Sequence, residues 1–294
     1  MTFFIDIIKG MLIGIANIIP GVSGGTMAVS LGIYDKLISS VSGLLKDWKS
    51  SLKTLLPIVL GCALGIVAFT YAIEYLLSRH TFLTCMAFVG LILGGIPILL
   101  ASLKKELQKS GSRIGLSGVL AFVLLFAVAV FLPMMNAEDE VLKTFSVSPG
   151  TMVSLFFVGV VASATMVIPG VSGSLVMMIL GYYYGIINTI KSFLDSLKAF
   201  DTAGLIHGFA LLVPFGIGVL LGIFLIAKLI TFLFEKYGIQ TYCAILGLIA
   251  ASPFAIFYNT GALSRISSLS PVSVLLGILL GAVFGLVTWK LGEK

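Results

Sequence analysis

The residues best suited to chemistry lie in two short, nearly identical stretches that interrupt strongly apolar sequence. The first copy reads Pro20-Gly21-Val22-Ser23-Gly24-Gly25-Thr26, and the second reads Pro169-Gly170-Val171-Ser172-Gly173-Ser174. Both copies place a serine directly after Pro-Gly-Val, and the two serines are 149 positions apart. The same offset carries Leu31, Gly32 and Tyr34 onto Leu180, Gly181 and Tyr183, so we interpret the two stretches as copies within an internal duplication.

A helix that begins at each break would create a site for an anion. Its first turn has backbone N–H groups without partners, and its dipole places roughly half a positive charge there. Hydroxyl groups donate to an anion, and glycines let it approach the backbone closely. The residues of these types at the two breaks are Ser23, Gly24, Gly25, Thr26, Ser172, Gly173 and Ser174. They predict an anionic group held at the membrane midplane without a fixed cation. The alternative is that the small residues only let helices pack closely.

Three further polar residues of the first half are candidate ligands. Asn17 precedes the first break, where it would cap the next helix, contact the ligand or only pack. Glu74 is acidic within an otherwise apolar helix, which suits a coupling proton or a lipid headgroup. The alternative for Glu74 is an interfacial pair with Arg79. Arg79 itself would meet a phosphate, or anchor its helix end at the interface by snorkelling.

The composition identifies an integral membrane protein. Hydrophobic residues make up 59% and charged residues 10% of the 294 residues, whereas soluble domains are about half apolar and a quarter charged. The apolar runs are roughly 20 residues long, which is enough to cross a bilayer as a helix. The net charge of +6 is explained by cytoplasmic loops, and no basic cluster with aromatic residues suggests nucleic-acid binding. The three cysteines have no metal-ligand spacing.

The order of apolar segments repeats in the two halves of the chain. Broken segments over 3–45 and 151–190 are each followed by three long apolar segments, at 54–77, 82–101 and 114–133 and at 204–234, 239–259 and 271–290. Glycines 61, 65 and 90 reappear as glycines 218, 222 and 247, now 157 positions on. The sequence therefore predicts a first membrane repeat over 1–135, an acidic external loop over 136–149 and a second membrane repeat over 150–294.

The distribution of charge predicts how the repeats are oriented. If each broken segment is re-entrant, each half crosses the membrane three times and the second repeat is inverted. Thirteen of the 18 Lys and Arg residues then lie in the cytoplasm and five outside, with both termini cytoplasmic. The alternative is that the broken segments span fully, which would make the repeats parallel. The expected fold is an all-α polytopic membrane protein of two inverted repeats, each with a broken re-entrant helical hairpin and about three transmembrane helices.

The first motif and its surroundings resemble a known membrane family. The stretch from Gly14 to Thr26, followed by Ile33-Tyr34, and the second copy from Val167 to Ser174, are similar to the PopT-like undecaprenyl-phosphate translocases, a bacterial and archaeal family formerly described as a domain of unknown function. The resemblance covers essentially the whole chain. The second copy departs from the first at Ser174 and Leu175, which replace Gly25 and Thr26, so the two copies need not contribute equally.

The resemblance implies a flippase of the cell membrane that returns undecaprenyl or another polyprenyl phosphate from the outer to the inner leaflet, where the lipid carrier is reused for cell-wall polymers. Its partners would be that lipid and the bilayer, with no nucleic acid and no cofactor, and with coupling to protons or sodium as an option. The rival hypothesis is a small-anion channel or exchanger that uses the same helix N-termini. An enzyme such as a lipid phosphatase is not expected, because His80 and His207 lie in no basic or acidic cluster.

Overall fold

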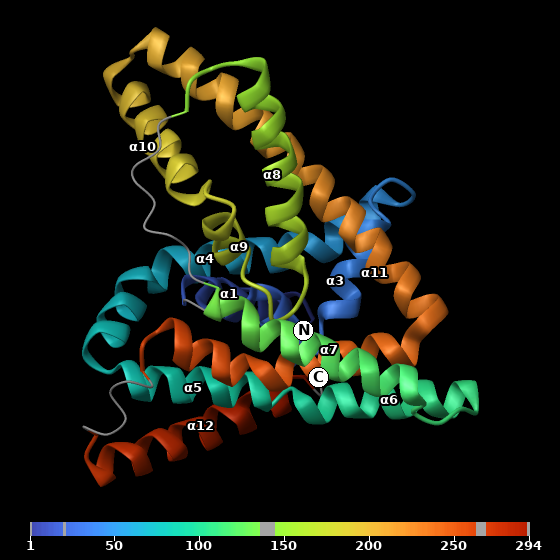
Figure 1. The fold of residues 1–294 in the computed structure, drawn as a ribbon. Helices are drawn as coiled ribbons and strands as arrows, with labels where there is room; N and C mark the ends of the chain where they lie inside the picture. The colour runs from blue at the N-terminus through green and yellow to red at the C-terminus, as the bar shows by residue number, and fades with distance from the viewer. Residues whose placement is uncertain (1, 20–21, 136–144, 263–268, 293–294) are drawn as a thin grey trace. The chain divides into compact units, whose positions relative to one another are not determined.

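In the computed structural model, residues 2–19, 22–135, 145–262 and 269–292 are described, and within them the chain is all-α (Figure 1). The helices of the first half are α1 (Thr2–Ile18), α2 (Gly24–Ser30), α3 (Tyr34–Ser42), α4 (Trp48–Arg79), α5 (Thr81–Leu93), α6 (Ile96–Ser110) and α7 (Leu116–Phe131), with a short 3-10 turn at Leu132–Met134. Those of the second half are α8 (Pro149–Val167), α9 (Gly173–Ile179), α10 (Tyr183–Ala199), α11 (Thr202–Asn259) and α12 (Pro271–Gly292). Pro20, Gly21 and most of the acidic loop predicted over 136–149 lie outside the described residues.

The helices confirm a multi-pass membrane protein. Six helical segments of the described chain are long and apolar enough to cross a membrane, and α5 and α6 count together as one of them. A seventh span results if α9 and α10, which meet at an angle of 107°, form one broken span or re-entrant loop. Their outward side chains are largely apolar and exposed, as expected for helices that face lipid.

The internal duplication is confirmed by a bend that occurs once in each half. Between α4 and α5, His80 has φ −132° and ψ 44°; within α11, Tyr237 has φ −131° and ψ 42°. Tyr237 is the residue that the offset of 157 assigns to His80. One turn after each bend, a threonine hydroxyl donates to a carbonyl before the bend, from Thr84 to Leu76 at 3.2 Å and from Thr241 to Leu233 at 3.1 Å. The two halves therefore break the same helix in the same way.

The first helix of each half also packs on the first long helix through equivalent glycines. In the first half, a Cβ on Gly61 would overlap the backbone of Ile7, so α1 and α4 are in backbone contact. In the second half, a Cβ on Gly218 would overlap the backbone of Phe156, which brings α8 equally close to α11. In each pair, residues further along one helix contact residues further along the other, so the two helices run parallel. Small residues in such pairs let two membrane helices approach at backbone distance.

The chain clusters into two compact units whose boundaries differ from those of the repeats. One unit comprises 1–134, 168–171 and 227–294, and the other comprises 135–167 and 172–226. Within the first unit the last helix of each repeat packs on the other repeat: α12 lies along α5 (Figure 1), and α7 lies along the second segment of α11, where Gln240 donates to Ser117. The predicted division of the chain into two repeats at 136–149 does not coincide with the compact units, because α7 and α12 pack on the other repeat. It stays a prediction.

The first broken segment returns to the end from which it started. Lys36 in α3 forms an ion pair with Asp6 in α1, with 2.7 Å between the ammonium nitrogen and the carboxylate oxygen. Thirty residues separate these two side chains in the sequence. A segment that crossed the membrane would carry Lys36 to the opposite side. The ion pair therefore supports the re-entrant form of this segment rather than the fully spanning alternative.

Equivalent helices of the two repeats run in opposite directions within the first unit. The start of α5 contacts the end of α11, where the sulfur of Cys85 lies 3.2 Å from the hydroxyl oxygen of Thr260. The end of α6 meets the beginning of the second segment of α11, where Glu106 lies against Gly238. The offset of 157 makes these segments counterparts, and their antiparallel course is that of inverted repeats.

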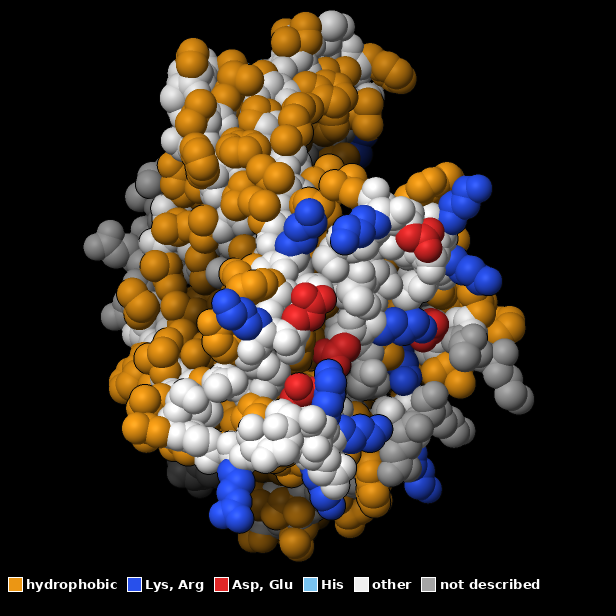
Figure 2. All heavy atoms as spheres, turned by 90° about the vertical axis from the view of Figure 1, so that its right-hand side faces the viewer, with side chains coloured by type: hydrophobic (Ala, Val, Ile, Leu, Met, Phe, Trp, Pro, Cys, Tyr) orange, Lys and Arg blue, Asp and Glu red, His pale blue; other side chains and the backbone are white. Residues whose placement is uncertain are grey.

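Charged side chains gather on one face of the first unit. Figure 2 shows Lys and Arg around a smaller number of Asp and Glu, over α3, the end of α6 and the bend of α11. Tyr242 donates to Asp35 at 3.2 Å, and Thr231 donates to Ser42 at 3.1 Å. The segments 36–53, 102–113 and 228–238, which the charge distribution places on one side of the membrane, do lie together. The assignment of that side to the cytoplasm stays a prediction.

Candidate functional site

The first motif forms the buried start of α2, and its serine is the most unusual polar group there. Ser23 is the N-cap residue, with extended backbone at φ −103° and ψ 137°, but its side chain makes no capping hydrogen bond. The side chain is 5% exposed, and its hydroxyl oxygen is buried without a hydrogen-bond partner. An unpaired buried hydroxyl costs about 1–3 kcal/mol. Such a group is retained when something else uses it, and here a ligand is the natural candidate.

The N–H groups that follow Ser23 add two more donors. Asn17 at the end of α1 accepts a hydrogen bond from the backbone N–H of Gly24 at 3.0 Å, so Asn17 acts as the cap. The N–H groups of Gly25 and Thr26 make no hydrogen bond with the described residues. An N-cap hydroxyl and the second and third N–H groups of a helix face the same region. Because α2 has only seven residues, these local donors matter more than its dipole.

The side chain of Thr26 joins the two motif copies. Its hydroxyl oxygen accepts a hydrogen bond from the backbone N–H of Gly170 at 2.6 Å. Thr26 is 1% exposed, so its hydroxyl serves this contact and not a ligand in open solvent. Gly170 has φ +78° and lies against Leu248, where a side chain would not fit. The turn at 168–171 of the second copy therefore packs into the first unit at the first motif.

The second motif uses its hydroxyl groups internally. The Ser172 hydroxyl accepts a hydrogen bond from the backbone N–H of Leu175 at 3.4 Å, as an ordinary N-cap does. Its oxygen also lies 2.9 Å from that of Ser174. Gly173 is buried against Met166 and Ala162 of α8. The serine therefore has a different role in each copy, since Ser172 caps its helix and Ser23 does not.

Glu74 and Arg79 form no hydrogen bond or ion pair with the described polar groups of the first motif. Both side chains are exposed in the last turns of α4, and the structure shows no ion pair between them. Neither makes a hydrogen bond with a described side chain. The alternative of an interfacial Glu74–Arg79 pair is thus not what the geometry shows, and roles in headgroup entry or coupling stay predictions.

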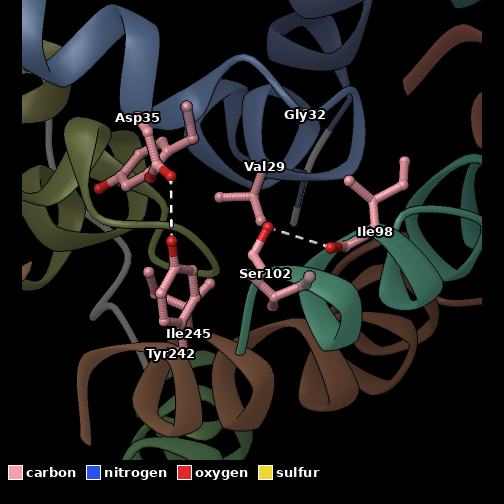
Figure 3. Close-up of a pocket in the computed structure, with 9 residues that line it drawn as sticks. Val29, Gly32, Asp35, Ile98, Ser102, Tyr242 and Ile245 are labelled. Atoms are coloured by element: carbon pink, nitrogen blue, oxygen red, sulfur yellow. Dashed lines mark hydrogen bonds between the residues drawn. The ribbon is translucent and has the colours of Figure 1, made fainter. Parts of the chain in front are cut away.

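Two cavities lie beside α3 on the charged face. The smaller, about 50 Å³, is lined by Asp35 and Tyr242 together with Ser102 of α6 (Figure 3). The larger, about 220 Å³, shares Asp35 and Tyr242 and adds Glu106 and Glu235. Burial raises the pKa of the Asp35 carboxyl, and the hydrogen bond from Tyr242 opposes that change in part. Three carboxylates repel a phosphate dianion, so the larger cavity does not suit the predicted anion.

The sequence did not single out Lys9 as a functional residue. Lys9 lies in α1 and is 4% exposed, so it places an amino group inside the fold. The available signal was the spacing of Asp6 and Lys9, which places two charges on one face of an otherwise apolar helix. The hydrogen bond between Tyr242 and Asp35 was not predictable from the sequence either, because 207 residues separate the two side chains. Among the described residues, no three His, Cys, Asp or Glu side chains gather as a metal site would require.

Most of the chain is similar in sequence to members of one protein family. Residues 13–268 match the family described as undecaprenyl phosphate translocase-like. A polyprenyl-phosphate transporter of Staphylococcus aureus (strain NCTC 8325 / PS 47) is 29% identical over 289 residues, which cover 97% of each chain. A polyprenyl-phosphate transporter of Vibrio cholerae serotype O1 is 29% identical over 263 residues, which cover 84% of this chain and 75% of the relative. No solved structure matches. The match spans the motifs and most of both repeats, and it confirms the resemblance found in the sequence: the chain belongs to the undecaprenyl phosphate translocase-like family.

Proposed function

We propose that this protein transports a polyprenyl phosphate across the membrane and holds the phosphate headgroup at the start of α2. Relatives named polyprenyl-phosphate transporters, which match over most of this chain, support the substrate class. The direction would be from the outer to the inner leaflet, so that the lipid carrier is used again in cell-wall polymer synthesis. The long apolar tail would stay in the bilayer while the headgroup crosses.

The observation that carries this proposal is the buried, unpartnered hydroxyl of Ser23. Together with the N–H groups of Gly25 and Thr26 it offers three donors to the oxygens of a phosphate monoester. Hydrogen bonds to a charged acceptor are about twice as strong as neutral ones, and they offset the cost of burying donors. Asn17 and Thr26 would hold this turn in place through Gly24 and Gly170.

The test is binding of defined lipids to the purified protein in nanodiscs, followed by thermal unfolding. Undecaprenyl phosphate should raise the melting temperature in a concentration-dependent way, because a ligand of the folded state stabilises it. Neutral undecaprenol, which keeps the tail and lacks the phosphate, should have little effect. Equal stabilisation by the two lipids would contradict phosphate recognition.

Inorganic phosphate in the same assay separates the transporter from a small-anion channel or exchanger. If the headgroup alone determined binding, inorganic phosphate would stabilise the protein as well as the lipid does. The proposal expects much weaker stabilisation, because the lipid tail adds apolar contacts and confines the headgroup to the membrane. Ser23→Ala should remove most of the lipid effect.

A further inference from the structure

Three charged residues form a partly buried cluster where the first re-entrant segment begins and returns. Asp6 and Lys9 of α1 are 8% and 4% exposed, and Lys36 of α3 reaches them from the surface with a side chain that is 43% exposed. The carboxylate of Asp6 accepts a hydrogen bond from the ammonium group of Lys36 at 2.7 Å. The cluster therefore has one carboxylate for two ammonium groups and a net charge of +1.

Lys9 is the unpaired charge of this cluster. Asp6 and Lys36 are the charged groups that face it, yet within the described chain its ammonium forms no ion pair and no hydrogen bond. A buried charge without a close partner is costly, and ionisable residues inside membrane proteins are kept mainly for function. Three N–H donors of Lys9, and two of Lys36, remain for another acceptor.

The second repeat provides an internal control for this cluster. The offset of 149 assigns Asp6 to Leu155, Lys9 to Val158 and Lys36 to Gly185. Leu155 and Val158 form a hydrophobic cluster with Ile186 and Leu211. The same helix pair therefore folds with an apolar core at this place. The fold does not require the charges of the first repeat, so their cost points to a ligand.

We propose that Lys9, with Lys36 beside it, forms a second anion site that takes a phosphate monoester, either the lipid headgroup or free phosphate. Lysine binds phosphate as a compact point charge with several donors. Asp6 holds Lys36 in place and lowers the net charge, which would allow release of the phosphate as well as binding. The identification of the lipid headgroup as the phosphate that binds in the cell rests on the proposed function. The ability of the site to bind a phosphate monoester does not.

This site is separate from the one at Ser23. Lys9 and Ile18 are nine positions apart in α1, which is about 14 Å along a helix. Side chains of a helix also point back toward its N-terminus, so Lys9 extends away from the motif. The headgroup would occupy the two sites in succession, with the Lys9 site nearer to the charged face of the first unit.

The test compares variants in nanodiscs by the dissociation constants for undecaprenyl phosphate, inorganic phosphate and neutral undecaprenol. Lys9→Met should weaken phosphate binding by on the order of tenfold or more, because it removes a charged donor. Lys9→Arg should keep binding within a few-fold. Lys198→Met, which removes an exposed lysine elsewhere, is the matched control and should bind as the wild type does.

A double variant, Asp6→Leu with Lys9→Val, places the residues of the second repeat in the first. It should melt at or above the wild-type temperature, because apolar side chains often replace buried ion pairs without loss. It should also bind phosphate as weakly as Lys9→Met does. Unchanged phosphate binding in either folded variant, or unfolding of both, would overturn the proposal. If Lys9→Met weakens the binding of inorganic phosphate, the site recognises the phosphate group alone. If Lys9→Met weakens only the binding of undecaprenyl phosphate, the site requires the lipid.

The proposed function fails separately from this inference. If Ser23→Ala abolishes lipid binding and Lys9→Met does not, the motif site stands and the Lys9 site falls. If Lys9→Met abolishes binding and Ser23→Ala does not, the Lys9 site stands and the motif site falls. If no phosphate ligand binds to the wild type, both are wrong.

Discussion

At the scale of single residues, the two motif serines show how a duplicated sequence has acquired two roles. Ser172 caps its helix and contacts Ser174, while Ser23 has a buried hydroxyl that caps nothing. The sequence could predict that serines stand at two helix starts. It could not predict which serine is satisfied, because that depends on whether a hydroxyl oxygen lies within about 3.5 Å of an N–H group.

The difference between the serines predicts opposite effects of the same substitution on stability. Ser172→Ala should lower the free energy of unfolding by about 1 kcal/mol, since it removes an N-cap. Ser23→Ala should leave stability unchanged or raise it by about 1 kcal/mol, since it removes a buried hydroxyl without a partner. Thermal unfolding without lipid measures both. A larger loss for Ser23→Ala than for Ser172→Ala would show that Ser23 has a structural bond.

Asp35 predicts a pH-dependent stability difference. Burial raises its pKa above the usual value near 4, so the folded protein binds the proton more tightly than the unfolded chain. The contribution of Asp35 to the free energy of unfolding is therefore fully present in acid. It is lost as the pH rises through the pKa that Asp35 has in the folded protein. Asp35→Asn keeps an acceptor for Tyr242 and never ionises. It should therefore unfold at a higher temperature than the wild type at neutral pH, with the difference shrinking toward pH 4. A difference that does not vary with pH would contradict this.

At the scale of elements, glycine sets the distance between paired helices. The spacing of the glycines at 61 and 65 predicts a close-packing face of α4, because small residues four apart lie on one side of a helix. Their backbone contacts with Ile7 and Met11 of α1 confirm this face. Their partner helix was not predictable, because any membrane helix presents an apolar surface. The exchange of α7 and α12 between the repeats was missed for the same reason. It is visible in the contacts of Gly90 with Gly281 and of Gly247 with Phe122.

Two neighbouring glycines of α11 provide a matched test of that packing. Gly218→Ala would place a methyl group against the carbonyl of Phe156 and should lower the free energy of unfolding by about 1–3 kcal/mol. Gly216 has no atom within 4 Å of the position of an added methyl group. Gly216→Ala should therefore be neutral or slightly stabilising, because alanine favours a helix. Equal melting temperatures of the two variants would argue against backbone contact between α8 and α11.

At the scale of the whole molecule, the structure supports two inverted repeats that begin with a re-entrant segment. Hydropathy and charge alone allowed both this arrangement and parallel repeats, because each broken segment is long enough either to cross the membrane or to turn back within it. The ion pair between Asp6 and Lys36 and the antiparallel course of equivalent helices support the inverted form. The binding of an anion at the two breaks without a fixed cation stays a prediction. Lys9 is a buried residue of α1 that the sequence-based prediction did not single out.

The orientation in the membrane can be tested with single cysteines. After replacement of the three native cysteines, Ser50→Cys and Ser112→Cys should react with an impermeant thiol reagent from the cytoplasm. Ser146→Cys should react from the outside. All three positions are exposed, so reactivity will report their side of the membrane. Labelling of Ser50→Cys or Ser112→Cys from the outside, or of Ser146→Cys from the cytoplasm, would contradict this orientation.

The central claim is that phosphate binding at Ser23 drives the movement of a polyprenyl phosphate between leaflets. Proteoliposomes loaded with undecaprenyl phosphate test it directly, through the rate at which headgroups in one leaflet become accessible to a reagent on the other side. The wild type should translocate the lipid, and Ser23→Ala should reduce the rate at least about tenfold while its melting temperature is unchanged or higher. Translocation by Ser23→Ala at the wild-type rate would contradict the claim.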